Sequence, residues 1–169
     1  VNKDSLERVL VKNPMIKSAQ VYYSLDGYIH VNIQQREPVL RVLTGEGYYV
    51  DRDGRVMPLS SKFTSRVVVA TGDINKKFAC EKLGPFAMKL KNEPFWDAYI
   101  EQLVVRSNED VVMIPKVGDF RIVLGKVDDC EARLEKLMLF LKDGITKKGW
   151  NRYKEINLKF DNQVVCVRK

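Results

Sequence analysis

The stretch MIKSAQVYYSLDGYIHVNIQQREPVLR, residues 15–41, decides how the rest of the chain is arranged. Within it, two runs of alternating apolar and polar residues flank Asp26-Gly27, a pair that tolerates the positive φ angles of a tight turn. The apolar positions are Ala19, Val21 and Tyr23 in the first run and Ile29, Val31 and Ile33 in the second. This pattern predicts a β-hairpin. Pro38 then ends the second strand, because proline has no N–H to donate to a β-ladder.

The segment before the hairpin is predicted to be a short helix that packs on it. Asp4 and Glu7 have the spacing of a capping box, in which two side chains satisfy free backbone N–H groups at the start of a helix. Apolar residues follow at helical spacing, at Leu6, Val9 and Leu10. Pro14 ends this pattern, because proline is not tolerated inside a helix.

The chain after Pro38 is typical of a second, β-rich unit. Its strand candidates are Val39–Leu43, Tyr48–Val50, Val56–Leu59, Val67–Ala70, Leu103–Arg106, Val111–Ile114 and Phe120–Leu124. Helical spacing returns between Phe78 and Gln102, where we interpret Phe95, Trp96 and Tyr99 as core residues. We therefore predict an α+β fold: a helix-plus-hairpin unit at residues 1–38, then a β domain at residues 39–169. Its antiparallel or mixed sheet carries helices on one face.

A longer helix is predicted after Asp128, which has a capping-box partner in Glu131. Its apolar stripe consists of Cys130, Leu134, Leu137, Met138 and Leu141. Gly144 is expected to end the helix as a C-cap.

The last segment, Tyr153 to Lys169, is predicted to form a hairpin around Asp161-Asn162. With a loop of two residues, Phe160 pairs with Gln163, Leu158 with Val165, and Ile156 with Val167. In this register Val164 and Cys166 lie on the face turned away from the core, because successive residues of a strand point to opposite faces.

Composition describes an ordinary globular protein of 169 residues, with 45% hydrophobic and 30% charged residues. No apolar run is long enough to span a bilayer, and the abrupt helical start leads us to expect a preceding segment. The net charge of +7 is spread along the chain, with tight clusters only at Lys76-Lys77 and Lys147-Lys148, so we expect no nucleic-acid partner. Three cysteines without a C-x-x-C pair are expected to be buried thiols.

The residues that catalysis needs do not stand together in this sequence. The single histidine, His30, lies in the middle of a predicted strand, and no nucleophile motif or glycine-rich phosphate loop accompanies it. Asp51-x-Asp53-Gly54 looks like the start of a calcium loop, but its later ligand positions are Arg55 and Lys62. We therefore predict a non-enzymatic binding module without cofactor or metal.

Several short motifs, in order, resemble the bacterial cell-division protein family FtsQ (DivIB). Residues 31–39, VNIQQREPV, resemble the phrase V-x-E-R-x-P-V-A, with the charged pair inverted. Residues 50–56, VDRDGRV, resemble V-D-x-x-G-x-V, and Gly72 falls where the family has a glycine after a strand. Phe120–Gly125 resembles a strand that ends in L-G. Residues 156–162, INLKFDN, resemble V-D-L-R-Y-x-x, with Gln163 in place of the family's glycine.

This resemblance implies a scaffold of the division complex that is anchored in the inner membrane by one span, with this region periplasmic. Residues 1–38 would be part of a POTRA domain that lacks its first strand and helix. The implied partners are FtsB and FtsL, and the implied mode is β-strand addition at the C-terminal edge strand. Lys159, Phe160 and Asn162 match family partner-binding positions, with Lys159 offered to a carboxylate and Phe160 as an aromatic anchor. The following strand adds Gln163, Val164, Cys166 and Arg168.

An alternative is a POTRA-bearing periplasmic module of an outer-membrane protein assembly or secretion machine. In that case client strands would add to the edge formed by Ile29–Ile33. This alternative predicts tandem POTRA repeats, and none is visible in the sequence.

Overall fold

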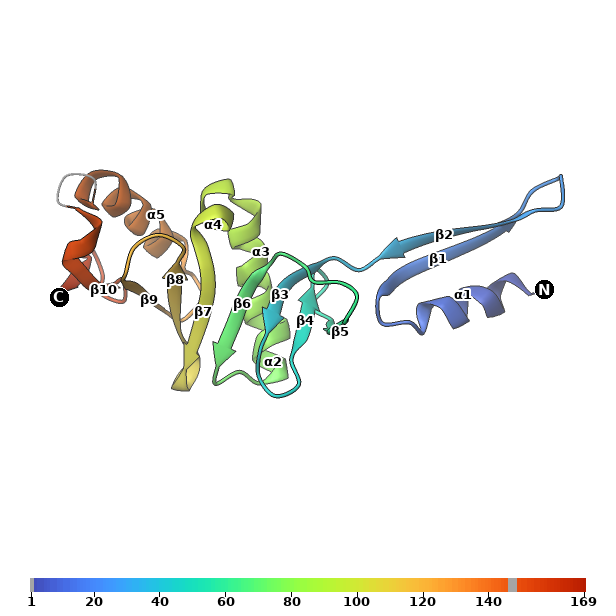
Figure 1. Ribbon diagram of the computed structural model, residues 1–169, viewed down its shortest axis with the longest axis horizontal. Coiled ribbons are helices and arrows are strands. Elements are labelled where there is room, and N and C mark those ends of the chain that lie inside the picture. The colour runs from blue at the N-terminus through green and yellow to red at the C-terminus, as the bar shows by residue number, and fades with distance from the viewer. Residues whose placement is uncertain (1, 146–148) are drawn as a thin grey trace.

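The computed structural model describes residues 2–145 and 149–169. The molecule is elongated, with the N-terminal hairpin projecting from one end and the C-terminal strands at the other (Figure 1). Its strands form two separate sheets, one of two strands and one of nine. Helices and a large mixed sheet together confirm the predicted α+β class. Whether the two parts are independent domains stays a prediction.

The predicted hairpin is confirmed, and a helix lies beside it. Strands β1 (Ile16–Tyr23) and β2 (Ile29–Gln35) pair antiparallel, with Val21 opposite Val31. The helix α1 (Lys3–Val11) begins at Asn2, whose side chain accepts from the Asp4 N–H, so the predicted capping box is wrong. Glu7 instead accepts from the backbone N–H of Val21 at 2.7 Å, and this bond ties α1 to β1.

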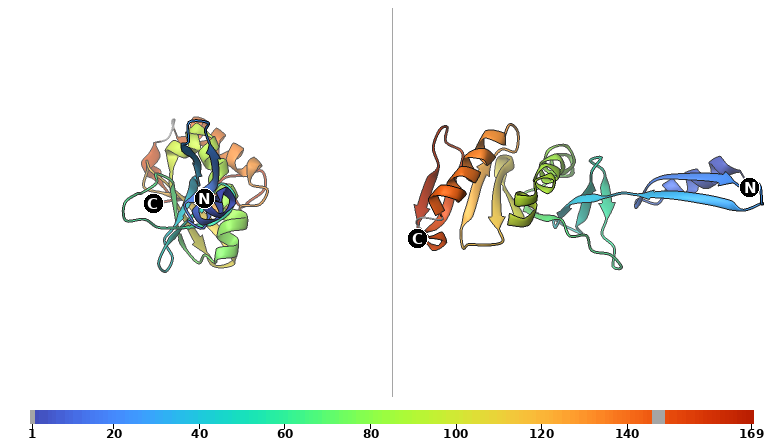
Figure 2. Two further views of the ribbon diagram at one scale, coloured as in Figure 1. Left: turned by 90° about the vertical axis from the view of Figure 1, so that its right-hand side faces the viewer. Right: turned by 90° about the horizontal axis from the view of Figure 1, so that it is seen from above.

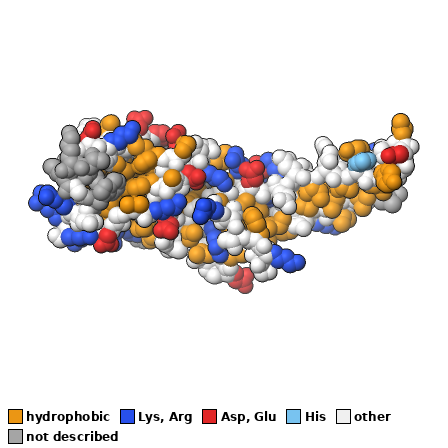
Figure 3. All heavy atoms as spheres, turned by 45° about the horizontal axis from the view of Figure 1, so that its top comes forward, with side chains coloured by type: hydrophobic (Ala, Val, Ile, Leu, Met, Phe, Trp, Pro, Cys, Tyr) orange, Lys and Arg blue, Asp and Glu red, His pale blue; other side chains and the backbone are white. Residues whose placement is uncertain are grey.

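Helix α1 covers only part of the apolar face of the hairpin. Ile16, Ala19 and Val21 of β1 are buried, whereas every residue of β2 is exposed. Hydrophobic side chains are therefore visible along this unit (Figure 3). The exposed apolar residues of β2 are Ile29, Val31 and Ile33.

The large sheet begins directly after the hairpin. Its strands are β3 (Pro38–Val42), β4 (Tyr48–Asp51), β5 (Val56–Pro58), β6 (Val68–Gly72), β7 (Ile100–Arg106), β8 (Asp110–Pro115), β9 (Arg121–Gly125), β10 (Tyr153–Asn157) and β11 (Val165–Arg168). Their order is β11-β10-β9-β8-β7-β6-β3-β4-β5. The pairs β3–β6, β6–β7 and β9–β10 are parallel, and the other pairs are antiparallel. From β6 to β11 the strands thus lie side by side in chain order.

The helices that follow β6 in the chain pack against one face of this sheet (Figure 2). They are α2 (Lys76–Phe78), the π-helical turn η1 (Ala79–Leu83), α3 (Gly84–Asn92), α4 (Pro94–Tyr99), α5 (Glu131–Leu139) and the π-helical turn η3 (Phe140–Ile145). Of the two 3-10 turns, η2 (Ser107–Glu109) joins β7 to β8 and η4 (Trp150–Arg152) directly precedes β10. Trp96 and Tyr99 are buried as predicted, but Phe95 is 41% exposed.

Helix α5 has the predicted apolar stripe but not the predicted ends. Cys130, Leu134, Leu137 and Leu141 are buried. The N-cap is Cys130 without a side-chain cap, because the left-handed backbone of Asp129, with φ of 46°, separates Asp128 from the helix. The Asp128 carboxylate pairs instead with the Lys82 ammonium at 2.9 Å. Gly144 lies inside the π-helical turn η3 and does not end the helix. Lys147 and Lys148 of the predicted basic cluster lie outside the described residues.

The predicted register of the C-terminal hairpin is wrong by one residue. Ile156 lies opposite Cys166, and Asn157 lies opposite Val165. The two-residue loop is not formed, because the pairing of β10 with β11 stops at Asn157 and Val165. Leu158 is fully buried and stays bonded to β9, where its N–H donates to the Val123 carbonyl at 2.9 Å. A shift of one residue exchanges the faces of the strand. Cys166 therefore packs against the core, as does Val164.

The junction between the hairpin and the large sheet is held by the turn after β4. The carboxylate of Asp51, only 1% exposed, accepts from the Arg36 guanidinium at 2.8 Å. Its other oxygen accepts from the backbone N–H groups of Asp53 and Arg55, which closes the turn. Lys17 of β1 pairs with Asp53 at 3.0 Å. Both parts are thus bound to the same turn.

Candidate functional site

Strand β11 is the outermost strand of the large sheet. It pairs with β10 on one side, and no described strand pairs with its other side. An edge strand presents a row of backbone N–H and C=O groups that another chain can pair with. The opposite edge, β5, spans only Val56–Pro58 and contains a proline, which cannot donate. Strand β11 is therefore the better template for an added strand.

The side chains of β11 divide between the core and solvent. Cys166 points to the core side, and burial raises the pKa of its thiol, so the thiol stays protonated at neutral pH. Val167, opposite Glu155, is 39% exposed, and Arg168 is exposed. An apolar side chain next to a free edge can be covered by an added strand, which makes Val167 a candidate contact residue.

The loop at 158–164, which joins β10 to β11, contributes the other candidate residues. Leu158 anchors it in the core, and residues 159–163 are all exposed. Phe160, at 47% exposed, is the large apolar side chain of this segment. Asn162 has a left-handed backbone with φ of 58°. An exposed aromatic side chain next to a free strand edge is typical of a protein contact.

The structure brings some of the predicted site residues together and separates others. Lys159, Phe160, Asn162 and Gln163 share the exposed loop, and Arg168 lies on the edge strand. Val164 and Cys166 pack partly against the core, so their predicted outward orientation is wrong. Sequence reasoning missed Val167, because the assumed register placed it on the buried face. No local pattern separates the two registers, because Leu158 is buried in both; they differ in the pairing of Asn157 with Val165.

A groove of about 660 Å³ opens beside this loop. Its lining residues come from the β7–β8 turn, the β9–α5 segment and the β10–β11 loop: Ser107, Asn108, Asp110, Gly125, Lys126, Asp129, Ala132, Arg133, Lys159 and Asp161. The non-glycine residues with positive φ in the described chain are Asn108, Glu109, Asp129 and Asn162, and all lie in these same connections. Such strained backbone tends to occur at functional sites.

The C-terminal end of the molecule is basic. Residues 149–169 contain five basic residues, Arg152, Lys154, Lys159, Arg168 and Lys169, but only two acidic ones, Glu155 and Asp161. Lys169 pairs with Asp119 at 2.8 Å, and this hydrogen bond lowers the pKa of the Asp119 carboxyl group. Lys159 pairs with Asp110 at 3.1 Å and Glu155 pairs with Arg121 at 3.1 Å, which leaves Arg152, Lys154 and Arg168 against Asp161. The remaining positive charge favours an acidic partner segment.

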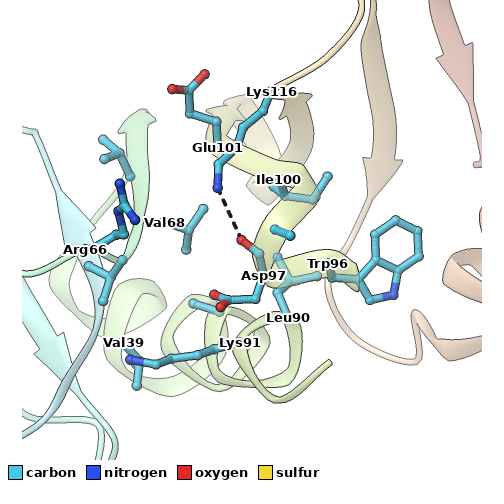
Figure 4. Close-up of a pocket in the computed structure, with 14 residues that line it drawn as sticks. Val39, Arg66, Val68, Leu90, Lys91, Trp96, Asp97, Ile100, Glu101 and Lys116 are labelled. Carbon is cyan, nitrogen blue, oxygen red and sulfur yellow. Dashed lines mark hydrogen bonds between the residues drawn. The ribbon is translucent and has the colours of Figure 1, made fainter. Parts of the chain in front are cut away.

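A second cavity, of about 620 Å³, lies at the start of β6 and β7 (Figure 4). Valine side chains and Trp96 line it, and charged side chains including Arg66, Glu101 and Lys116 surround it. Lys116 donates to the Asp97 carbonyl at 3.4 Å, across the mouth of this cavity (Figure 4).

Among residues 2–145 and 149–169 no group of three or more potential metal ligands occurs. His30 lies on the hairpin, stacked on Tyr22 at 4.9 Å.

Comparison with known protein families identifies one family for most of the chain. A family model described as FtsQ/DivIB, C-terminal related, matches residues 37–167. The chain belongs to the FtsQ/DivIB family. No curated protein matches the chain. The match runs from the residue before β3 into β11 and thus covers nearly the whole large sheet.

Membership in the FtsQ/DivIB family gives this chain a role in cell division, within a family of non-catalytic scaffolds. It favours this role over the outer-membrane assembly alternative. The hairpin unit lies before the match, so its identity as a POTRA domain stays a prediction. No helix in the described part of the chain is both long enough and apolar enough to cross a bilayer.

The structure explains why several FtsQ-like motifs need their residue types. Asp51 of V-D-x-x-G is the buried partner of Arg36 in the preceding R-x-P phrase. Gly54 has φ of +75°, which the turn requires. Gly72 has φ of +107°, and a Cβ there would lie 2.1 Å from the Val105 carbonyl oxygen. These motifs therefore specify the junction and the sheet, and not the edge strand.

Proposed function

We propose that this FtsQ-type chain is a scaffold of the bacterial division complex that binds FtsB and FtsL by β-strand addition at β11. The observation that carries the proposal is the position of β11 at the end of the nine-stranded sheet, with one side not paired by any described strand. Strand addition satisfies backbone groups that are otherwise left to water, and side-chain contacts then select the partner.

The surroundings of β11 support this mode of binding. Val167 offers apolar surface on the strand, and Phe160 offers an aromatic anchor in the loop just before it. The excess of basic residues at this end of the chain favours a partner strand that carries carboxylates. We propose that Asn162, Gln163 and Arg168 supply polar contacts at the rim, because all three are exposed.

By the same proposal the whole protein is held in the inner membrane by a single span, and the described region lies in the periplasm. The chain would then bind FtsB and FtsL outside the cytoplasm. The hairpin unit, as part of a POTRA domain, would stand between the anchor and the large sheet.

A charge on the edge strand tests the proposal directly. We would measure binding of the purified FtsB–FtsL pair to the wild type, to Val167→Glu and to Val167→Thr by calorimetry. A charged side chain on an edge strand opposes the addition of a further strand, and glutamate would also repel the carboxylates proposed for the partner, whereas threonine keeps the β-branched shape. We expect Val167→Glu to weaken binding at least about tenfold and Val167→Thr only slightly. Phe160→Ala should also weaken binding, by about tenfold or more.

Equal affinity of Val167→Glu and wild type, with unchanged thermal stability, would exclude β11 as the binding strand. Val164 is less suitable for this test, because a charge at a side chain packed against the core would also destabilise the fold. Nuclear magnetic resonance adds a second criterion. The amides of Val165–Arg168 should gain protection from solvent exchange when the partner binds.

A further inference from the structure

The loop at 158–164 is fixed to the body of the β domain by two side chains that lie outside it. The Lys136 ammonium on α5 donates to the Phe160 carbonyl at 2.6 Å and to the Leu158 carbonyl at 3.4 Å. On the other side, the Lys159 ammonium pairs with the Asp110 carboxylate on β8 at 3.1 Å. The loop is therefore held from the helix face and from the sheet at neighbouring residues.

These contacts act on the segment that carries the exposed aromatic side chain. Phe160 has its own carbonyl bound by Lys136, while the residue as a whole is 47% exposed. Without that bond, an exposed loop whose residues 159–163 make few packing contacts would sample many conformations. A partner would then have to order the loop on binding, and this ordering reduces affinity.

The environment of Lys159 shows that this residue is already committed within the chain. Its side chain passes over Gly125, where an added Cβ would lie 3.0 Å from the Lys159 Cγ. Its backbone N–H donates to the Asn157 side chain at 3.0 Å. The interpretation of Lys159 as a free cation offered to a partner carboxylate therefore needs revision, because its ammonium already has an acidic neighbour.

We infer that Lys136 and Asp110 are positioning residues, which hold the β10–β11 loop in the conformation that presents Phe160 beside β11. Neither side chain needs to touch the partner. Lys136 binds loop carbonyls, and Asp110 acts through Lys159. The consequence for binding rests on the proposed function, whereas the order of the loop is a property of the free protein.

The test compares Lys136→Met, Lys136→Arg and Asp110→Asn with the wild type. Methionine keeps most of the aliphatic stem of lysine but cannot donate, and arginine can still donate to both carbonyls. Asp110→Asn leaves the shape of the side chain and removes its charge; it also removes the weaker contact with Arg106 at 3.9 Å. Lys77→Met, at an exposed lysine of α2, is the matched control.

Two measurements are made on each variant. Amide hydrogen exchange of the free protein should become faster at residues 159–163 in Lys136→Met and in Asp110→Asn, and should return to the wild-type rate in Lys136→Arg. Affinity for the purified FtsB–FtsL pair should fall about fivefold to tenfold in Lys136→Met, with Lys77→Met unchanged. A general loss of stability would instead raise exchange throughout the sheet.

Each outcome decides a separate point. Unchanged loop exchange in Lys136→Met would overturn the inference, as would faster exchange with full affinity. Failure of the wild type to bind the FtsB–FtsL pair would overturn the proposed function. In that case loop exchange in the free variants still determines whether Lys136 and Asp110 position the loop.

Discussion

Removal of the negative charge of Asp51 is expected to weaken the junction between the hairpin and the large sheet. The Asp51 side chain is 1% exposed and the Arg36 side chain 10% exposed, so water screens their ion pair little. One Asp51 oxygen accepts from the N–H groups of Asp53 and Arg55, and the other accepts from Arg36. In Asp51→Asn the amide oxygen can keep the turn, but the amide N–H₂ group would face the guanidinium. The substitution therefore isolates the ion pair.

The size of the effect follows from this geometry. Loss of a hydrogen bond to a buried charged group costs about 1.5–3 kcal/mol, and loss of one partner of a buried pair costs about 3–5 kcal/mol. Because the turn can remain closed, we expect about 3 kcal/mol of lost unfolding free energy. For a chain of this length that loss lowers Tm by about 6–12 °C.

Urea unfolding of Asp51→Asn, Arg36→Met and the double variant measures this coupling. Asp53→Asn is the matched control, because its pair with Lys17 is 42% and 43% exposed and is expected to contribute at most about 1 kcal/mol. Residual dipolar couplings would also report whether the hairpin and the sheet still share one orientation. A loss below about 0.5 kcal/mol in Asp51→Asn would refute the reasoning, as would equal losses in Asp51→Asn and Asp53→Asn.

Two further predictions concern the core. Burial raises the pKa of the Tyr99 phenol to about 12, so the folded state binds its proton more tightly than the unfolded state. The contribution of Tyr99 to the free energy of unfolding should therefore be fully present below about pH 10 and should fall by about 2–3 kcal/mol as the pH rises to about 12. Tyr99→Phe should remove this part of the alkaline loss of stability. Identical pH profiles of the two proteins would contradict the prediction. Gly72→Ala should cost more than about 3 kcal/mol in urea unfolding, because its Cβ would lie 2.1 Å from the Val105 carbonyl oxygen. Gly27→Ala, with φ of +86° but nothing within 4 Å, should cost only about 1 kcal/mol, and a similar cost at both sites would argue against the clash.

Local patterns in the sequence predicted the elements that local chemistry determines. Asp26-Gly27 indicated the position of the first hairpin, and the apolar stripe from Cys130 to Leu141 indicated the buried face of α5. Turn residues and side-chain periodicity act within a few residues of one another, so they can be read from the chain directly. The α+β class followed from the sequence of these elements.

Contacts between distant segments determined what could not be predicted. Asp128 has the right spacing for a helix cap, but Lys82, far away in the sequence, binds its carboxylate. The register of β11 follows from the connection at 158–164, in which Leu158 is buried and bonded to Val123 of β9 and residues 159–163 are exposed, so that Asn157 and not Leu158 pairs with Val165. The loop and the edge strand of the candidate site were therefore found, but the side chains assigned to each face were exchanged.

The edge position of β11 separates recognition from folding. Among the described strands β11 pairs only with β10, so the strands from β3 to β10 and their helices hold most of the core without it. A single protease cut in the exposed residues 159–163 could release β11 and leave that core in place. Under the proposed function such a protein would be folded but unable to recruit its partners, so its activity could be switched off by proteolysis without unfolding.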